Sequence, residues 1–223
     1  MRRISEQGKH KEHRGEGIGA NYKPYIQARE FNSLGTCSNP IDWKTGRTVE
    51  LLSQTEKAVW YLLRWDDQVA DIQEQYPLEL SKTVALSQEL GIRHPKDTST
   101  RMTTDFFVTM KNKSRMAVSV KASRADLESN RTIEKLYLEK QYWKSQGVPF
   151  SLVFKSDVNM TAVNNIRLIT EFYSPESVFD EVSALKHLIA QKLIHVDLAK
   201  EPLNFQKLLN NYREVVEKWM KSH

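Results

Sequence analysis

Apolar side chains in the middle of the chain recur with two different periods. Between residues 49 and 65 they are spaced three or four apart, which predicts an amphipathic helix that begins after Ser53 and ends near Trp65. Downstream, runs of strand-forming residues alternate with further helical periods. In order, these predict a strand at 69–80, a short helix at 83–90, strands at 105–110 and 116–121, a long helix at 127–146 and a strand at 148–154. The polar turn between the two middle strands predicts a hairpin.

The pattern changes near Tyr173, after which two helical apolar stripes follow one another. The first stripe is formed by Val178, Val182, Leu185 and Leu188, and the second by Phe205, Leu208, Leu209, Tyr212, Val216 and Trp219. A region of roughly 50 residues is small for an independent core. We therefore predict a domain over residues 21–172 and a small, mostly helical C-terminal region over 173–223, which packs on that domain or contacts a partner.

The first 20 residues are polar, contain glycine and are rich in Arg, Lys and His, which predicts a flexible segment. Charge alone does not separate a plain tail from a basic arm that lies along DNA, for which Arg14 and Lys23 are the candidate contacts. The run GEGIG lacks a preceding strand and a following Gly-Lys-Ser/Thr, so it is not a phosphate-binding loop. We expect it to be a flexible hinge.

Composition narrows the possible functions. The 223 residues carry a formal charge of +5, and phosphate contacts are favourable for basic proteins because they release condensed counterions. Many basic proteins never bind nucleic acid, so charge leaves this question open. The single cysteine, Cys37, excludes a disulfide framework and a cysteine-based zinc site, and the six histidines lack metal-ligand spacing. No segment resembles a signal peptide or a membrane span, so we expect a cytoplasmic protein.

The hairpin brings together residues that suit metal-dependent chemistry. If its turn is symmetric about Lys113, Asp105 lies opposite Lys121, and Ser119 shares their face while the Val120 side chain points away. Carboxylate oxygens suit Mg²⁺, which polarises a scissile phosphate and activates an attacking water, while a lysine orients that water and offsets phosphate charge. A second carboxylate is usually required, and Glu56 on the preceding helix is the expected source.

Each of these residues also has an ordinary structural explanation. An Asp facing a Lys across a hairpin is common as a surface ion pair that contributes under about 1 kcal/mol. Ser53-Gln54-Thr55-Glu56 spells a capping box, in which the serine and the glutamate accept hydrogen bonds from free N–H groups at the helix start. One carboxylate cannot serve fully both as a cap and as a metal ligand. Spacing alone therefore leaves the nuclease hypothesis open.

Several blocks of sequence strengthen that hypothesis. The stretches are RGEGIGANYKPY, KTGRTVELLS, LLSQTEKAVWYLLRWDDQVADIQEQYPL, IRHP, MTTDFFV, AVSVKA and RTIEKLYLEKQYW. In this order and spacing they resemble the TnsA family of transposon endonucleases. The resemblance implies an α/β fold with a restriction-endonuclease-like core, in which helices flank a mixed central sheet, and a small helical C-terminal region. It also implies a bacterial protein that acts at the nucleoid.

The resemblance assigns roles to the same residues. Glu56, Asp105 and Lys121 would be catalytic, and Glu56, Asp105 and the Val120 carbonyl would bind Mg²⁺, for which Mn²⁺ can substitute. The position two before the lysine, Gln or Glu in the usual motif, is Ser119, whose hydroxyl could bind the metal only through a water. We expect activity to survive this departure, because the other ligands remain.

The resemblance further implies partners and a reaction. Such a subunit cuts the 5′ strands at transposon ends during cut-and-paste transposition, alongside a DDE-type, TnsB-like transposase subunit and an AAA+, TnsC-like ATPase regulator. Two alternatives stay open: a catalytically silent architectural subunit that binds DNA or the transposase, favoured by Ser119, and a free-standing restriction or repair nuclease. The modest net charge disfavours the second, since an unaided endonuclease needs a stronger basic surface.

Overall fold

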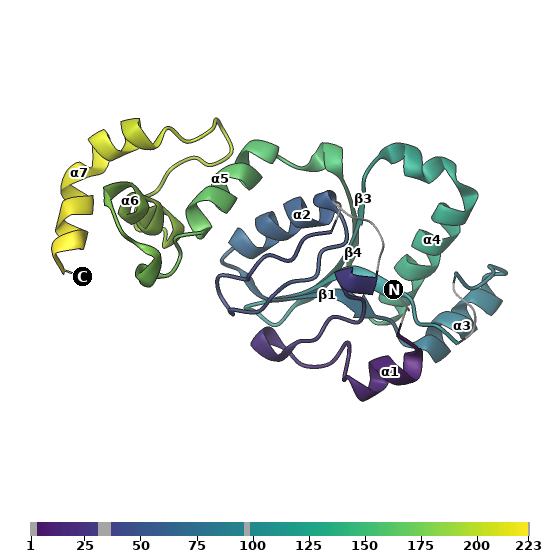
Figure 1. The fold of residues 1–223 in the computed structure, drawn as a ribbon. Coiled ribbons are helices and arrows are strands. Elements are labelled where there is room, and N and C mark those ends of the chain that lie inside the picture. Colours follow the sequence, from purple (N-terminus) through teal and green to yellow (C-terminus); the bar gives the residue numbers. More distant parts are fainter. Residues whose placement is uncertain (1–3, 31–36, 96–98, 223) are drawn as a thin grey trace. The chain divides into compact units, whose positions relative to one another are not determined.

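The computed structural model describes residues 4–30, 37–95 and 99–222, which form two compact units (Figure 1). Unit 1 spans Met1–Val158 and unit 2 spans Asn159–His223. The division therefore falls earlier than the boundary predicted after residue 172. The reason is an additional helix, Met160–Thr170, which belongs to the C-terminal unit and which the sequence pattern did not separate from the preceding domain.

Unit 1 is built on a four-stranded mixed sheet. Its main elements are α1 (Glu6–Lys11), α2 (Gln54–Trp65), β1 (Val69–Pro77), α3 (Leu80–Glu89), β2 (Thr103–Met110), β3 (Arg115–Lys121), α4 (Asn130–Ser145) and β4 (Phe150–Phe154). The strand order is β1-β2-β3-β4, with β1, β2 and β3 antiparallel and β4 parallel to β3. The predicted elements and the α/β class are thus confirmed, with boundaries that differ by a few residues.

The core of unit 1 lies between the sheet and α4. Phe107 stacks on Tyr76 and on Trp143 of α4, with ring centroids 4.5 and 5.0 Å apart, and Ala117 and Leu138 are fully buried beside them. Aromatic pairs at these distances add to the free energy gained by burying their area. α2 lies against β1 and β3, and α3 packs beside α4 (Figure 1). The sheet is therefore packed against α2, which precedes the hairpin in the sequence, and against α4, which follows it.

The hairpin register differs from the symmetric one expected. Phe106 pairs with Val118, so that paired residue numbers sum to 224 and the register places Asp105 opposite Ser119, not opposite Lys121. The cause is a three-residue loop closed by Lys113, whose φ of 68° lies in the left-handed region. Because the shift moves each partner by two positions, Asp105, Ser119 and Lys121 still belong to one face.

The N-terminal segment is folded onto β1, which differs from the flexible arm and hinge predicted. Gly15 approaches Pro77 so closely that a Cβ atom there would lie 2.3 Å from the proline side chain, and its φ is +80°. The Gln73 side chain donates to the Gly17 carbonyl at 2.9 Å, and the Gly19 N–H donates to Asp71 at 3.1 Å. Gly15 thus permits close packing of this segment against the first strand.

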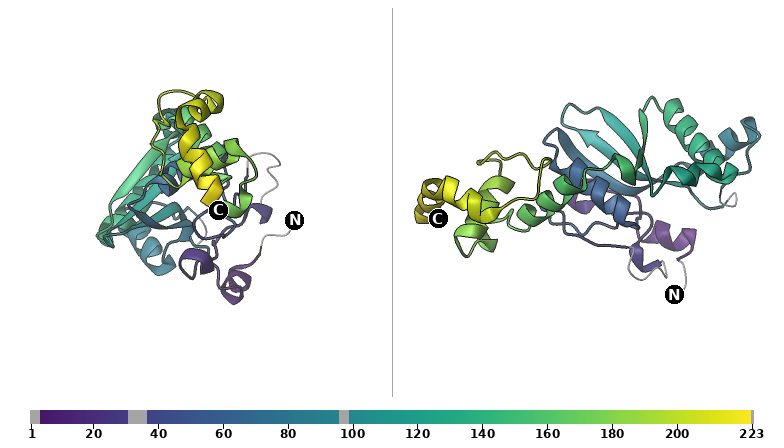
Figure 2. Two further views of the ribbon diagram at one scale, coloured as in Figure 1. Left: turned by 90° about the vertical axis from the view of Figure 1, so that its left-hand side faces the viewer. Right: turned by 90° about the horizontal axis from the view of Figure 1, so that it is seen from above.

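Unit 2 consists of helices. They are α5 (Met160–Thr170), α6 (Glu181–Ala190) and α7 (Phe205–Ser222). The α6 and α7 helices predicted from the apolar stripes are confirmed and pack against each other (Figure 2). The buried Asn165 side chain donates to the carbonyls of Leu198 and Glu201 at 2.9 and 2.8 Å, which fixes the α6–α7 connection to α5. In the described part of the chain, no helix has the length and apolar character of a membrane span.

Candidate active site

Glu56 lies in the first turn of α2 and serves as part of the helix cap. The Glu56 N–H donates to Ser53 Oγ at 3.1 Å, and Ser53 Oγ in turn donates to Glu56 Oε1 at 2.9 Å. The other carboxylate oxygen accepts the Leu52 N–H at 3.0 Å, where a standard capping box would use the N–H of Ser53. The side chain is buried, so the cap holds a carboxylate inside unit 1.

Asp105 and Lys121 are linked through the main chain of Val120. The Val120 N–H donates to Asp105 Oδ2 at 2.7 Å, and Lys121 Nζ donates to the Val120 carbonyl at 3.0 Å. The Val120 side chain is buried, as expected for the opposite face. The main-chain N–H of Val120 therefore orients the aspartate, and the main-chain carbonyl oxygen of the same residue lies beside the lysine ammonium.

Gln75 of β1 connects the two predicted carboxylates. Its Nε2 donates to Glu56 Oε2 at 3.2 Å, and its side chain also favours the ionised form of Asp105, whose pKa it lowers. Gln75 is 2% exposed and has a φ of 49°. The structure thus brings Glu56, Asp105 and Lys121 into one region, and adds a residue that no sequence motif indicated.

A third carboxylate, Glu139 of α4, completes the polar cluster and was also missed. Its carboxylate accepts from Ser119 Oγ at 2.8 and 2.9 Å and from Thr104 Oγ1 at 2.7 Å. A helical signal was available, because Glu139 lies three residues after Leu136 and four before Trp143 and so falls on the buried face. Ser119, predicted to contact a metal-bound water, instead lies 2% exposed with its hydroxyl on Glu139.

Burial dominates the electrostatics of the cluster. Desolvation, reinforced by the charge of Asp105, raises the pKa of Glu56 to about 7, and the same two causes raise the pKa of Glu139 to about 7. Burial also raises the pKa of Asp105, opposed by the Lys121 charge and by the Val120 N–H. The cluster thus contains three carboxyl groups, and the Lys121 charge lowers the pKa of two of them, Asp105 and Glu139.

The oxygen donors of this cluster suit a hard cation. Two carboxylates and a main-chain carbonyl, from Glu56, Asp105 and Val120, are ligand types that Mg²⁺ accepts, and Mg²⁺ usually retains several waters. Among the residues that the structure describes, no three His, Cys, Asp or Glu side chains are grouped closely enough to hold a metal by themselves. A metal here would therefore also need the carbonyl oxygen, water or substrate phosphate.

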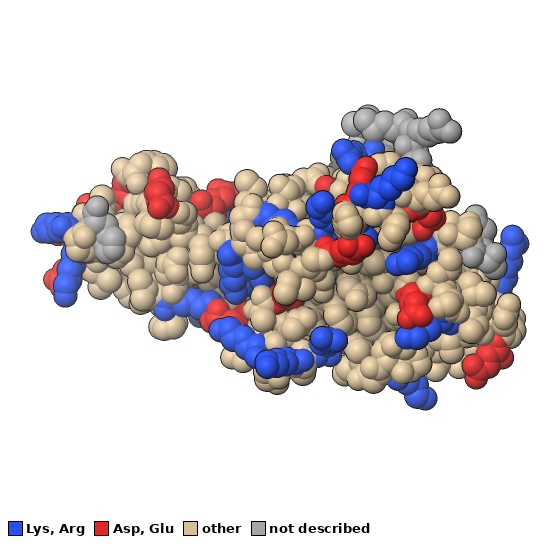
Figure 3. Space-filling view, turned by 90° about the horizontal axis from the view of Figure 1, so that it is seen from below, with Lys and Arg blue, Asp and Glu red and all other residues tan. Residues whose placement is uncertain are grey.

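The two residues predicted to contact DNA differ in their surroundings. The prediction that Arg14 contacts DNA is wrong. Its side chain is buried and forms ion pairs with Glu30 and, at 2.8 Å, with Glu12, so it is not available to a phosphate. Its charge is used to hold the N-terminal segment. Lys23 is exposed, and its Nζ lies 3.4 Å from the Glu12 carbonyl oxygen. One face of the molecule carries Lys and Arg side chains at several places with acidic groups between them (Figure 3).

Comparison with known proteins supports the relationship that the sequence blocks suggested. Residues 66–155 match the family model described as the N-terminal domain of TnsA-like endonucleases, a range that includes Asp105, Lys121 and Glu139. The chain is 36% identical over 190 residues to the transposon Tn7 transposition protein TnsA of Escherichia coli, an alignment that covers 82% of this chain and 69% of that protein. The chain therefore belongs to the TnsA family of transposon endonucleases.

Proposed function

We propose that the protein is the metal-dependent DNA endonuclease subunit of a Tn7-type transposase and hydrolyses the 5′ strands at transposon ends. The observation that carries this proposal is the convergence of the buried Glu56 with Asp105 and Lys121, both half-buried, in a region that has more carboxylates than cations. Such an arrangement is unfavourable for folding alone and favourable for binding a divalent cation. Membership of the TnsA family supports the reaction class.

In the proposed mechanism each residue has a separate task. Mg²⁺ or Mn²⁺, when bound, would polarise the scissile phosphate and lower the pKa of an attacking water. Glu56, Asp105 and the Val120 carbonyl would hold that ion, and the Val120 N–H, 2.7 Å from Asp105 Oδ2, keeps the aspartate oriented. Lys121 would turn from the Val120 carbonyl, 3.0 Å away, to orient the water and offset phosphate charge.

Glu139 would support this site from the α4 side. Its carboxylate accepts hydrogen bonds from Ser119 and Thr104, and the Asp105 charge raises the pKa of Glu139. Ser119 stands where the usual family motif has Gln or Glu. We propose that the small serine leaves room for Glu139 and that a water, rather than a longer side chain at position 119, completes the metal coordination.

The partners follow from the family and are proposals for this chain. The relative is named as a Tn7 transposition protein, so we propose that transposon-end DNA, a DDE-type TnsB-like subunit and an AAA+ TnsC-like ATPase regulator act with this protein. Unit 2, Asn159–His223, is the candidate for the partner contact, because Phe179 and Leu193, in the connections before and after α6, are largely exposed at 77% and 65%.

A reconstituted cleavage reaction tests the proposed function. The purified protein, with its transposase and ATPase partners, is incubated with strand-labelled transposon-end DNA in Mg²⁺ or Mn²⁺, and compared with Asp105→Ala and Glu56→Gln. We expect 5′-strand cleavage by the wild type and a loss of at least about 10³-fold in both variants, since each removes a metal-binding carboxylate. Cleavage should also stop in EDTA.

Two other outcomes separate the alternatives. If the wild type and both variants leave the 5′ strands intact while transposition complexes still assemble, the protein is an architectural subunit. If the wild type cleaves DNA that lacks transposon ends, without partners, it is a free-standing nuclease. Thermal unfolding of each variant provides the control that a loss of cleavage does not come from a loss of fold.

A further inference from the structure

Gln75 has a backbone conformation that strand formation does not require. It lies in the interior of β1, with its neighbours Glu74 and Tyr76 paired in register to Phe106 and Thr104 of β2. Its own φ of 49° is left-handed, a conformation that residues other than glycine, asparagine and aspartate rarely adopt. Such a residue persists only where its surroundings determine the conformation, and such sites cluster at functional centres.

The left-handed conformation delivers the Gln75 amide to the two acidic residues. An ionised carboxylate only accepts hydrogen bonds, so the bond to Glu56 Oε2, at 3.2 Å, comes from the Nε2 group, and the same amide lowers the pKa of Asp105. That group has two hydrogens. The Oε1 atom accepts from Thr103 Oγ1 at 3.4 Å, which leaves the amide in a defined orientation with its donors towards the carboxylates.

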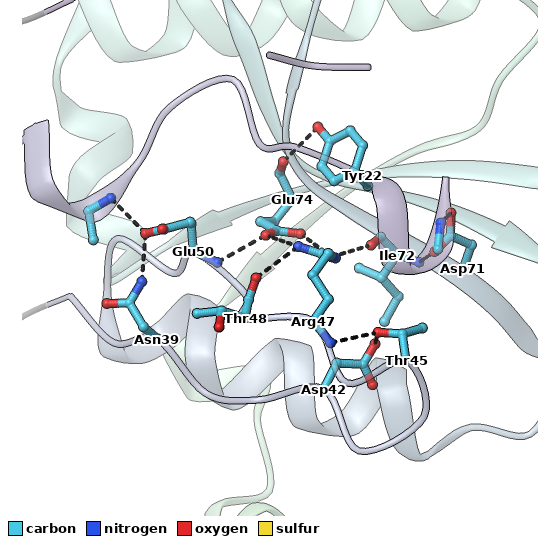
Figure 4. Close-up of polar contacts among 12 residues, drawn as sticks. Tyr22, Asn39, Asp42, Thr45, Arg47, Thr48, Glu50, Asp71, Ile72 and Glu74 are labelled. Carbon is cyan, nitrogen blue, oxygen red and sulfur yellow. Dashed lines mark hydrogen bonds and ion pairs between the residues drawn. The ribbon is translucent and has the colours of Figure 1, made fainter. Parts of the chain in front are cut away.

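A buried network on the preceding residue holds this backbone in place (Figure 4). The Tyr22 hydroxyl donates to the Glu74 carbonyl at 2.9 Å, which fixes the peptide group between Glu74 and Gln75. The Glu74 carboxylate accepts two bonds from Arg47, at 2.6 and 2.7 Å, and the Glu50 N–H at 2.9 Å. The Glu74 side chain is fully buried, and both its carboxylate and its main-chain carbonyl are hydrogen-bonded. These contacts fix the backbone that leads into Gln75.

We propose that Gln75 is a positioning residue, whose amide holds the Glu56 and Asp105 carboxylates in the relative orientation that binds a divalent cation. This inference rests on the proposed function, because it concerns the same metal site. Glu56 and Asp105 come from different elements, α2 and β2, and they repel each other when ionised. The Gln75 donors offset that repulsion and leave the remaining lone pairs of both carboxylates available to a metal.

The test measures metal binding directly, without cleavage. Mn²⁺ is titrated into the full-length protein by calorimetry, with free Mn²⁺ followed in parallel by electron paramagnetic resonance. Gln75→Met keeps the length of the side chain but removes the amide. We expect its Mn²⁺ affinity to fall by about 10-fold or more, the range found when a hydrogen-bond partner of a metal ligand is removed.

Gln73→Met is the matched control. Gln73 lies in the same strand and is also buried, but its Nε2 donates to the Gly17 carbonyl and not to a carboxylate. We expect the Mn²⁺ affinity of this variant to stay within about twofold of the wild type, whatever happens to its thermal stability, because the hydrogen bonds to the metal ligands persist. A drop of the same size in both variants would assign the effect to general loosening of β1 and overturn the inference.

Two further variants keep the test decisive. If Gln75→Met fails to fold, Gln75→Asn replaces it, because asparagine tolerates a left-handed φ but is one methylene too short to bridge both carboxylates. Wild-type affinity in a folded Gln75 variant overturns the positioning role. Asp105→Ala distinguishes this failure from that of the proposed function: if it abolishes Mn²⁺ binding, the metal site stands without Gln75. If the wild type itself binds no Mn²⁺, both proposals fall.

Discussion

Two neighbouring regions of unit 1 bury carboxylates in opposite ways. Glu74, fully buried in β1, receives two hydrogen bonds from Arg47 and one from the Glu50 N–H, so its charge is compensated within the fold (Figure 4). Glu56, Asp105 and Glu139, by contrast, are bonded mainly to neutral donors, and Lys121 lowers the pKa of only Asp105 and Glu139 among them. The charge of the first region is compensated within the fold, whereas the second region is the one proposed to bind a cation.

The difference shows that burial of an acidic residue does not by itself mark a functional site. Buried charges are tolerated when a partner charge and hydrogen bonds offset their desolvation, as they do at Glu74. Where the offset is incomplete, the pKa values rise, which is the case for Glu56 and Glu139 at about 7. The degree of compensation therefore separates the structural carboxylate from those proposed to bind a metal.

The largest expected effect is on stability, when the two regions receive the same substitution. Glu74→Gln leaves the Arg47 guanidinium buried without its charge partner and should lower the free energy of unfolding by about 3 kcal/mol. Glu56→Gln keeps the helix cap, since glutamine also serves there, and removes an unfavourable buried charge. At pH 8 in EDTA it should leave stability unchanged or raise it, as measured by urea unfolding.

A double variant controls this comparison. Arg47→Met with Glu74→Leu replaces the ion pair by apolar groups of similar size, so it should be more stable than Glu74→Gln alone. If Glu56→Gln instead loses as much stability as Glu74→Gln, the two regions do not differ in compensation and the contrast drawn between them is wrong.

An effect of comparable size is expected from pH on the metal-free protein. Because the pKa of Glu56 is raised to about 7 in the fold, the folded state binds more protons than the unfolded state between its ordinary pKa and that value. Its contribution to stability is thus complete below about pH 4.5 and is lost as the pH rises towards 7. We expect a loss of roughly 3 kcal/mol, since the pKa of Glu56 rises from its ordinary value to about 7 and one pKa unit corresponds to about 1.4 kcal/mol.

Urea unfolding from pH 4.5 to 8 in EDTA measures this dependence. Glu56→Gln isolates the contribution of one carboxylate, because the difference between the two curves should grow with pH and level off above pH 7. Mn²⁺ at pH 8 should raise the free energy of unfolding of the wild type but not that of the variant. Parallel curves for the two proteins would contradict the raised pKa of Glu56.

The sequence predicted the elements of unit 1 and the residues of the site better than it predicted their contacts. Local periodicity was sufficient to predict α2 and the hairpin. The predicted register was wrong by two positions, but side chains alternate along a strand, so Asp105 and Lys121 remain on one face. The register depended on the loop conformation at Lys113, which charge and hydrophobicity do not encode.

Residues that act through tertiary contacts were beyond sequence reasoning. Gln75 has no motif around it, and its role depends on a left-handed φ set by contacts from Tyr22 and the Arg47–Glu74 pair. Glu139 lies on the buried face of a helix, yet only the folded sheet brings Ser119 to it. The N-terminal segment was predicted to be flexible from its composition, but its glycines permit close packing that composition does not reveal.

The smallest expected effect concerns two basic residues of the N-terminal segment, one of which has its charge balanced by buried ion pairs while the other does not. Arg14 is buried between two glutamates, while Lys23 is exposed and its Nζ meets a carbonyl oxygen at 3.4 Å. Lys23→Ala should weaken binding to any duplex DNA by roughly two- to fivefold and reduce the salt dependence of log Kd by about one unit, because one phosphate contact is lost. Fluorescence anisotropy between 50 and 200 mM salt measures both quantities.

Lys200→Ala, which removes the same charge from unit 2, controls for net charge. If both variants change the affinity equally, Lys23 contributes only to the overall charge and contacts no phosphate.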